Sequence, residues 1–302
     1  MHYNFLTFDV EDYFQVSAFE KVSPLDSWEK WELRVEKNTD KLLELLDESG
    51  QNATFFVLGW VAERCPEISR KIAAAGHEVA SHGYAHRRVY TQSREEFGAD
   101  IRRSKQLLED QVGEEVFGYR APSFSISEKV SWAYDELYDA GYRYDSSVFP
   151  VKHDLYGISE WPQRANCVVK TEEGGWVYSA DCVGECHCLR EIPVSTFRFA
   201  GQNLPITGGG YFRLLPYRFT RYLLNYFLFR KHQPFMFYLH PWEIDPEQPH
   251  ISGAGWKSRF RHYLNLDLTE RRLRLLLREF HFTAIREFLT LDREHSEILK
   301  AS

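Results

Sequence analysis

The sequence predicts an α/β fold in which short buried strands alternate with amphipathic helices. Short apolar runs recur along the first two-thirds of the chain, and residues 53–57, rich in Phe and Val, form one of them. Between these runs lie segments with helical periodicity, such as the leucines of residues 39–49, which stop at Gly50. Polar residues directly follow several runs, as in a βα series, whose chemistry lies at the carboxyl ends of parallel strands.

Each expected element has its own signal. Apolar or aromatic runs predict strands at residues 3–8, 53–57, 78–80, 116–119, 142–144, 176–179, 235–239 and 283–285. Helical stripes predict helices at residues 39–49, 66–75, 216–231 and 268–280, and a further helix after Ser93 whose inward face extends from Phe97 to Val112. Pro66 stands at a first helical position, and Ser93 with Glu96 forms a capping box. A second capping box, Ser125 with Glu128, predicts one more helix before the strand at 142–144.

The middle of the chain is less regular. Residues from about 150 to 215 are expected to form an irregular excursion, and Gly208-Gly209-Gly210 indicates a flexible loop with a tight turn or a close backbone approach. No internal repeat, low-complexity tract or linker interrupts the chain. We therefore expect a single domain over residues 1–302, with a C-terminal helical extension over residues 255–302.

Composition narrows the function. The chain has 302 residues, of which 43% are hydrophobic, enough for a substantial core. The formal net charge of -7 disfavours nucleic-acid binding, which usually needs a basic face. No apolar run is long enough to span a bilayer, and no signal peptide is evident, so a cytoplasmic location is expected. Aromatic residues make up 16%, and surplus aromatics often line carbohydrate sites.

The five cysteines do not suggest a disulfide framework, because their number is odd. Cys182, Cys186 and Cys188 flank His187, which would suit a structural zinc site or a redox pair. Paired Cys-x-x-Cys knuckles are absent, however, so an ordinary structural role is favoured.

Two short segments supply most of what a hydrolytic site needs. Asp9, Glu11 and Asp12 follow the first expected strand, and His82 and His86 follow the third. Two neutral imidazoles and one carboxylate can bind a divalent cation and leave a position open for water. A further carboxylate beside that water can take its proton. The other polar residues that follow expected strands are Arg120, Asp145 and His240.

The order of these motifs resembles the polysaccharide deacetylases. Thr-Phe-Asp, His-x-x-x-His, Arg-x-Pro, Tyr-Asp-Ser and Leu-His follow one another over roughly residues 5–240, as in the NodB-homology domain of carbohydrate esterase family four. Asp-Val-Glu-Asp-Tyr-Phe, Arg-Ala-Pro-Ser-Phe and Gly-Gly-Gly-Tyr-Phe-Arg look like an exopolysaccharide-locus branch, similar to peptidoglycan deacetylases and allantoinases that carry Asp-x-Asp. The resemblance implies an α/β fold of a particular kind, a distorted (β/α) barrel with fewer than eight regular strands.

The resemblance also implies catalytic roles. Asp9 corresponds to the general base, Arg120 to the partner of that base, and His240 to the general acid that protonates the departing amine. Asp145 corresponds to the residue that orients the acid. The plainer alternatives are a strand-end cap, a surface arginine, a core histidine and a simple turn.

The implied metal ligands are His82, His86 and one carboxylate. The family's common pattern places the carboxylate directly after the base, but Val10 stands there and cannot bind a metal. The Asp-x-Asp variants point to Glu11, with Asp12 as the competitor. Zinc is the expected cation, and cobalt or nickel is possible, because His/carboxylate ligation does not choose among them.

The implied activity is metal-dependent removal of N-acetyl groups from amino sugars of a polysaccharide or its precursor, with release of acetate. Pro122 and Phe124 are candidates for the wall of a substrate groove. The candidate faces for sugar stacking, for which core packing is almost as good an explanation, are Tyr13, Phe14, Tyr211 and Trp242. A backbone N–H near Tyr13 is a candidate oxyanion donor. Two alternatives stay open: an allantoinase-like hydrolase of a cyclic amide and a non-catalytic carbohydrate-binding protein.

Overall fold

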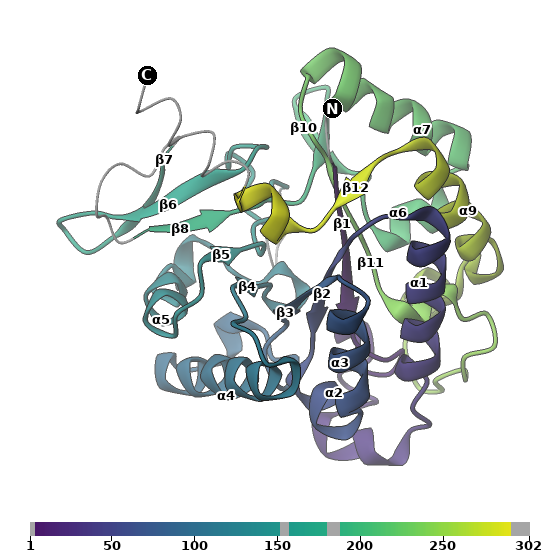
Figure 1. The fold of residues 1–302 in the computed structure, drawn as a ribbon, viewed down its shortest axis with the longest axis horizontal. Coiled ribbons are helices and arrows are strands. Elements are labelled where there is room, and N and C mark those ends of the chain that lie inside the picture. The colour runs from purple at the N-terminus through teal and green to yellow at the C-terminus, as the bar shows by residue number, and fades with distance from the viewer. Residues whose placement is uncertain (1–3, 152–156, 180–187, 291–302) are drawn as a thin grey trace.

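The structure is a computed structural model that describes residues 4–151, 157–179 and 188–290. One sheet holds most of the strands in the order β11-β1-β2-β3-β4-β5-β8-β6-β7, and β12 also pairs with β1 (Figure 1). The strands of this sheet are β1 (Asn4–Val10), β2 (Thr54–Val57), β3 (Glu78–Ser81), β4 (Gly118–Tyr119), β5 (Tyr144–Asp145), β6 (Asn166–Lys170), β7 (Trp176–Ser179), β8 (Cys188–Glu191), β11 (Met236–Leu239) and β12 (Phe282–Thr283). All pairs from β11 to β8 are parallel, and antiparallel pairing begins where β6 joins β8.

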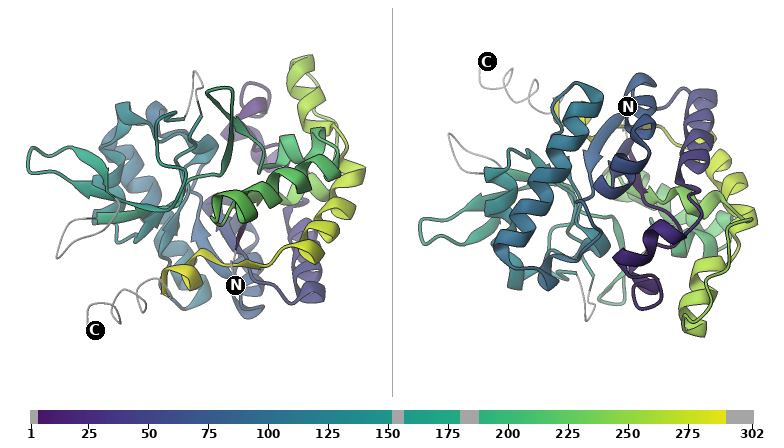
Figure 2. Two further views of the ribbon diagram at one scale, coloured as in Figure 1. Left: turned by 90° about the horizontal axis from the view of Figure 1, so that it is seen from above. Right: turned by 90° about the horizontal axis from the view of Figure 1, so that it is seen from below.

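Helices surround the parallel strands, as the views from above and below show (Figure 2). They are α1 (Val35–Ser49), α2 (Gly59–Arg64), α3 (Pro66–Ala74), α4 (Arg94–Val112), α5 (Ala133–Asp139), α6 (Gly209–Leu214), α7 (Tyr217–Tyr226), α8 (Trp256–Tyr263) and α9 (Leu266–Glu279). None of the described helices is long and apolar enough to cross a bilayer.

Strand β1 lies between β11 and β2 in the sheet and is buried along its whole length. Its successive side chains point to opposite faces, because a strand has a period of two. Leu6, Phe8 and Val10 join the large core cluster beneath the helices. Phe5 joins a second, smaller cluster on the other face, together with Met236 of β11 and other residues. Asp9 shares the face of Phe5, so a carboxylate ends the side of β1 that faces the smaller cluster.

The parallel strands do not close into a complete barrel. In the described part of the chain, β8 and β11 do not pair with each other, and irregular segments lie between them. There, Val194 N–H donates to Val148 O at 3.1 Å, and Thr207 Oγ1 donates to Ser195 O at 2.7 Å. Tyr238 N–H in β11 then donates to Thr207 O at 3.0 Å. The expected α/β class is confirmed, and the barrel it was expected to form is distorted and open.

The C-terminal part of the chain returns to the first strand. β12 pairs in parallel with the start of β1, Asn4 with Phe282 and Phe5 with Thr283, and the two lie side by side near the N-terminal end (Figure 2). The expected helical extension therefore also contains a strand that belongs to the main sheet. β1 therefore pairs with strands that are distant from one another in the sequence: with β2 and with both β11 and β12.

Two further expectations need correction. The helix after Ser125 is not opened by the expected capping box, because Ser125 Oγ accepts the N–H of Val89 at 3.0 Å and α5 begins only at Ala133. The expected loop at residues 206–211 is instead the start of a helix, because α6 begins at Gly209. The irregular excursion contains β6, β7 and a separate hairpin of β9 (Thr196–Phe199) with β10 (Gln202–Pro205).

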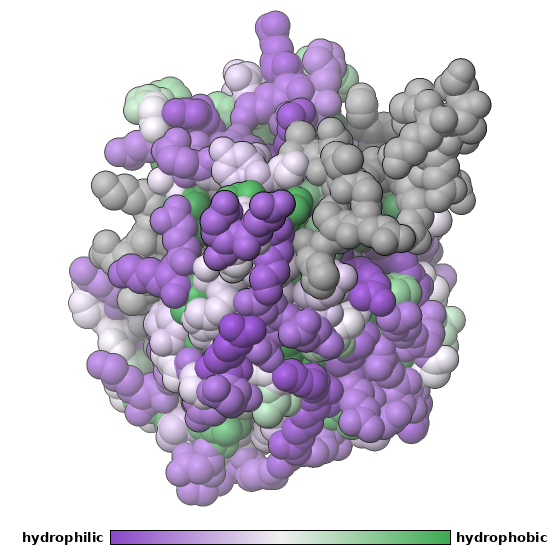
Figure 3. Space-filling view, turned by 90° about the vertical axis from the view of Figure 1, so that its left-hand side faces the viewer, coloured by the Kyte–Doolittle hydropathy of each residue, from purple (hydrophilic) through white to green (hydrophobic). Residues whose placement is uncertain are grey.

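The face at the outer edge of the sheet is largely hydrophilic (Figure 3). The edge strand β7 is an exception within it, because Val177 and Tyr178 are each about half exposed. The candidate chemistry lies elsewhere, at the carboxyl ends of β1, β3, β4 and β11.

Candidate active site

Strand register brings four of the expected site residues to one end of the sheet. Phe8 pairs with Leu239, so Asp9 and His240 follow at the same level on neighbouring strands. Ser81 pairs with Tyr119, so His82 and Arg120 also follow side by side. In parallel strands these carboxyl ends meet at one edge.

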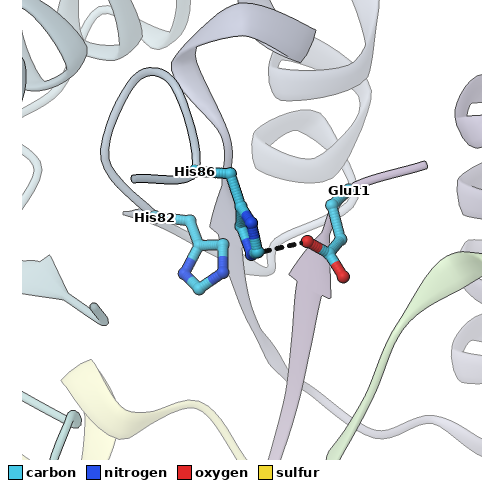
Figure 4. A group of neighbouring side chains, drawn as sticks. All are labelled: Glu11, His82 and His86. Atoms are coloured by element: carbon cyan, nitrogen blue, oxygen red, sulfur yellow. Dashed lines mark ion pairs between the residues drawn. The ribbon is translucent and has the colours of Figure 1, made fainter. Parts of the chain in front are cut away.

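Glu11, His82 and His86 form a group that could hold a metal ion (Figure 4). One ligand atom from each residue lies within 4.8 Å of the others. His86 Nε2 lies 2.7 Å from Glu11 Oε2, yet this buried carboxylate oxygen has no hydrogen-bond partner. Two metal-ligand atoms that face the same cation lie close together without forming a hydrogen bond. His86 Nε2 and Glu11 Oε2 have this arrangement.

His82 is held in the state that a metal ligand needs. Its Nδ1 lies 2.8 Å from the backbone carbonyl of Arg120, an acceptor that places the proton on Nδ1 and leaves Nε2 with its lone pair. Burial lowers the pKa of His82 to about 4, so the ring is neutral near pH 7. A neutral imidazole with a free Nε2 is the form that binds divalent cations.

Helix α4 fixes the loop between the two histidines. The Asp100 carboxylate accepts the backbone N–H of Tyr84 at 2.8 Å and that of Ala85 at 3.3 Å. His86 has a positive φ of 51°, which turns its ring back toward His82. The two rings lie 5.3 Å apart. Asp100 is thus a candidate supporting residue of the site that the sequence alone did not reveal.

The neighbouring acids Glu11 and Asp12 lie in different surroundings. Glu11 follows a tight turn in which its N–H donates to Asp9 O at 3.0 Å. Burial by itself raises the pKa of Glu11, but His86, His240 and His82 together lower it to about 2, so the carboxylate is ionised. The expectation that Glu11, in preference to Asp12, joins the histidines agrees with this grouping.

Asp12 is instead engaged by backbone amides. Its Oδ2 accepts the N–H groups of Arg34 and Val35, at 2.7 and 2.9 Å, where α1 begins. Its Oδ1 accepts the N–H of Tyr13 at 2.9 Å. The Tyr13 N–H is therefore occupied and does not offer the oxyanion contact that the sequence suggested.

Asp9 is paired with Arg120, as expected. Arg120 NH1 donates to Asp9 Oδ1 at 2.6 Å and to Thr7 Oγ1 at 2.8 Å. Arg120 is completely buried and its guanidinium lies 4.1 Å from the centre of the Phe56 ring. This anchoring leaves Asp9 Oδ2 directed toward His240, whose Nε2 lies 3.9 Å away.

His240 faces both carboxylates through Nε2, which lies 3.6 Å from Glu11 Oε1. Its other ring nitrogen, Nδ1, lies 2.8 Å from Glu243 Oε1. Burial alone lowers the pKa of His240, but the hydrogen bond to Glu243 and the charges of Glu11, Glu243 and Asp9 raise it to about 9. In the absence of a cation, the ring is therefore protonated near pH 7.

The structure does not place Asp145 beside His240. Asp145 ends β5 opposite Glu191 of β8, and its carboxylate accepts the hydroxyl of Ser147. Burial raises the pKa of both acids. The carboxylate in contact with His240 Nδ1 is Glu243, three residues further along the chain.

Most of the expected sugar-stacking aromatics are core residues. Tyr13 and Phe14 are buried and pack with Trp28, Trp31 and Trp60. Packing, the alternative considered for these rings, accounts for them.

Trp242 is buried between two imidazoles, 5.1 Å from His240 and 4.1 Å from His262. Pro122 and Phe124 are also buried, Phe124 next to Tyr238. Tyr211 is the one of these six candidates that is substantially exposed, at 42%.

Of the cysteine cluster, the structure describes Cys188. Cys182, Cys186 and His187 lie outside the described residues, so its role stays untested. Cys167 in β6 is disulfide-bonded, which the odd number of cysteines did not suggest.

The α/β fold thus brings a histidine pair, a carboxylate that could join them at a cation, and a further carboxylate and histidine to one strand edge. Residues 5–144 match the family model described as polysaccharide deacetylase, and residues 146–290 match a domain of unknown function, DUF3473. Residues 5–144 therefore form a polysaccharide deacetylase domain, of the NodB-homology type.

The similar proteins agree with this family. A peptidoglycan-N-acetylglucosamine deacetylase of Bacillus cereus is 31% identical over 99 residues, 32% of this chain and 36% of the relative. A peptidoglycan deacetylase of Helicobacter pylori is 31% identical over 108 residues, 36% of each chain. The chain thus spans about a third of the length of these relatives.

Among solved structures, a candidate polysaccharide deacetylase from Mycobacterium smegmatis has a TM-score of 0.59 at 19% identity, covering 97% of this chain and 90% of that one. This likeness shows the fold.

Proposed function

We propose that this protein is a metal-dependent de-N-acetylase that acts on amino sugars of a polysaccharide or its precursor and releases acetate. The observation that carries the proposal is the grouping of Glu11, His82 and His86 next to an anchored carboxylate, Asp9, and an imidazole, His240. Two imidazoles and a carboxylate are a ligand set of catalytic zinc sites. The match of residues 5–144 to the polysaccharide deacetylases supports the reaction class.

The residues present fit a divalent cation. Glu11 is ionised, His82 offers a free Nε2, and the buried Glu11 Oε2 has no hydrogen-bond partner. A cation held there would supply Lewis acidity, which lowers the pKa of water and polarises the acetyl carbonyl. Zinc is our first choice, with cobalt or nickel as alternatives, because this donor set suits all three.

The chain's own groups can move the required protons. Asp9 Oδ1 is tied to Arg120, which leaves Oδ2 to accept a proton from the attacking water. The water oxygen bonds to the acetyl carbon, and the C–N bond breaks. His240 Nε2, which lies 3.9 Å from Asp9 Oδ2, gives a proton to the departing nitrogen, because an amide anion is too basic to leave. The products are acetate and a free amine.

The substrate class is inferred from relatives and from one residue. The similar proteins are named as a peptidoglycan-N-acetylglucosamine deacetylase and a peptidoglycan deacetylase, so we propose an N-acetylated oligo- or polysaccharide for this chain. The motif forms shared with exopolysaccharide loci favour an exopolysaccharide precursor. Tyr211, exposed at the second residue after the start of α6, is the candidate for sugar contact.

The test combines metal analysis with acetate release. The metal-depleted protein, reloaded with zinc, cobalt or nickel, should release acetate from N-acetylglucosamine oligomers and leave allantoin intact. His82→Ala should lose both metal and turnover. His240→Ala should keep the metal and lose about 100-fold or more in turnover, a typical general-acid contribution.

Other outcomes would favour other functions. Ring opening of allantoin without acetate release would support an allantoinase-like hydrolase. Stoichiometric metal and glycan binding without turnover on any amide would support a carbohydrate-binding protein. Wild-type rates in both histidine variants would refute the proposed site.

A further inference from the structure

The acid side of the site is built from the second half of the chain. Glu243 is completely buried and accepts three donors: the backbone N–H of His240 at 3.0 Å, its ring Nδ1 at 2.8 Å, and Arg213 Nε at 2.7 Å. Each of these residues lies in the segment that matches the domain of unknown function.

Arg213 fixes Glu243 from the far side. Besides its contact with Glu243, the buried guanidinium donates through NH1 to three backbone carbonyls, those of Arg261, His262 and Leu264, at 2.9, 2.7 and 3.0 Å. Arg213 therefore neutralises the buried carboxylate and ties it to the end of α8. A buried ion pair with this many hydrogen bonds is rigid, because neither partner can move without leaving an unpaired charge.

Two glycines make room for this arrangement. A Cβ at Gly209 would lie 1.9 Å from Glu243 Oε1 and 2.1 Å from Oε2, so only glycine permits the carboxylate to rest there. A Cβ at Gly208 would lie 2.0 Å from the Tyr238 ring. The Gly-Gly-Gly-Tyr-Phe-Arg segment thus provides both the space for Glu243 and, through Arg213, its counter-ion. The close backbone approach expected for the triplet is confirmed.

The ring of His240 is also held by its flat side. Trp242 stacks on it with an interplanar angle of 22°, and His262 in turn stacks on Trp242 with an angle of 16°. With Nδ1 bound to Glu243 and one face against Trp242, Nε2 is directed at the Asp9 and Glu11 carboxylates. Trp242 is thereby part of the support of His240 and not a sugar platform.

We infer that Glu243, held by Arg213 and accommodated by Gly209, is the positioning residue of His240, in the place that the sequence assigned to Asp145. This inference rests on the proposed deacetylation. By accepting from Nδ1–H, the carboxylate keeps one proton on Nδ1, so the proton given to the leaving nitrogen comes from Nε2. After the transfer, His240 is neutral with its remaining proton on Nδ1, still bound to Glu243.

The test compares two leaving groups. Glu243→Gln replaces an acceptor with an amide that can donate to Nδ1 and so favours the wrong tautomer. We expect kcat on N-acetylglucosamine oligomers to fall about 100-fold or more, with little change in KM and the same metal content. Hydrolysis of 4-nitrophenyl acetate, whose leaving group needs no proton, should change far less. A merely structural role would lower both rates together.

Three further variants sharpen the result. Glu243→Asp, which keeps the charge but is one methylene shorter, should recover part of the amide rate. Gly209→Ala should lower the amide-to-ester ratio by displacing Glu243. Asp145→Asn should leave that ratio unchanged, whatever it does to the overall rate. A drop in the ratio for Asp145→Asn but not for Glu243→Gln would overturn the inference.

The ¹⁵N spectrum of the His240 ring separates failure of this inference from failure of the proposed function. In the wild-type protein Nδ1 should carry a proton, and Glu243→Gln should shift that nitrogen. If no amide were hydrolysed by the wild type, the proposed reaction would fail on its own. An unchanged ring spectrum in Glu243→Gln would refute the positioning role independently of turnover.

Discussion

Glu11 and Asp12 are adjacent in the sequence, yet their carboxylates do different work. Glu11 lies against His86, while Asp12 accepts two backbone N–H groups at the start of α1 and the N–H of the next residue, Tyr13. From the sequence, the third metal ligand could be limited to these two acids but not chosen between them. A shift of one residue in the extended backbone reverses which of the two side chains faces the histidines. The tight turn at Asp9–Glu11 makes the decision.

Substituting each acid by itself should separate an effect on metal affinity from an effect on the stability of the fold. Glu11→Gln should lower metal affinity by more than the 10–100-fold that is typical of losing an outer partner of a metal ligand. Asp12→Ala should keep metal affinity but reduce the free energy of unfolding by about 1–2 kcal/mol, as loss of a helix cap does. Calorimetric metal titration and urea unfolding measure the two effects. The opposite pattern would make Asp12 the ligand.

The pKa of His82 predicts how the metal-free protein responds to acid. Its folded pKa of about 4 lies below the ordinary value of 6.5, so the unfolded state binds the proton first as pH falls. Stability should therefore decline between about pH 6.5 and 4, by on the order of 3 kcal/mol from this group. Urea unfolding across this pH range measures the slope, and His82→Gln should reduce it. An unchanged slope in the variant would contradict the assignment.

At the scale of elements, the sequence predicted helix starts correctly where residues at the helix end itself determine them. The Ser93/Glu96 capping box opens α4 as expected, and Pro66 begins α3. Helix α6 was missed because glycine has low helix propensity, and this helix exists through the contacts of Gly209 and Arg213 with Glu243.

Glu243 could have been found from its spacing. His240-Pro-Trp-Glu243 has proline at a first helical position and glutamate at the third, which is the pattern of a capping box. Asp100 carried no such signal, because its partners are the backbone amides of a loop 15 residues or more away in sequence. Contacts of this kind require the folded chain.

Helix α4 should control metal affinity through Asp100. Asp100→Ala would release the N–H groups of Tyr84 and Ala85, and the loop that carries His82 and His86 would lose its fixed geometry. We expect metal affinity to fall about 10–100-fold, as for other supporting residues of metal sites. Competition with a fluorescent chelator measures the change. The matched control is Gln106→Ala on the exposed face of α4, and an equal loss there would point to general destabilisation.

At the scale of the whole molecule, the two segments recognised by different family models contribute to one sheet. β1 pairs with β2 from the first segment and with β11 and β12 from the second. The candidate site divides in the same way: Asp9, Glu11, His82 and His86 come from the first segment, and His240 with Glu243 comes from the second. The sequence predicted this joint site only through the order of its motifs, because the pairing of β1 with β11 is long-range.

A core substitution in the second segment should destabilise the first as well. Phe280 is buried and packs edge-on against Phe235, 5.4 Å away. Phe280→Ala should cost about 3–5 kcal/mol, the usual cost of removing a buried phenylalanine side chain. Because the sheet is shared, far-UV circular dichroism and the fluorescence of the tryptophans near Phe14 should show one common transition.

The control for this prediction is Phe260→Ala, since Phe260 in α8 is more than half exposed and should matter little. Two separated transitions, with only one shifted by Phe280→Ala, would show that the segments unfold independently.

The pairing of β1 with β11, which is distant in the sequence, has a consequence for synthesis of the protein. Phe5 is synthesised long before its partner Met236. Until Met236 is added, the backbone N–H and C=O groups on one edge of β1 are unpaired. They can then pair with other nascent chains. Expression at lower temperature or with holdase chaperones should therefore raise the yield of correctly assembled protein.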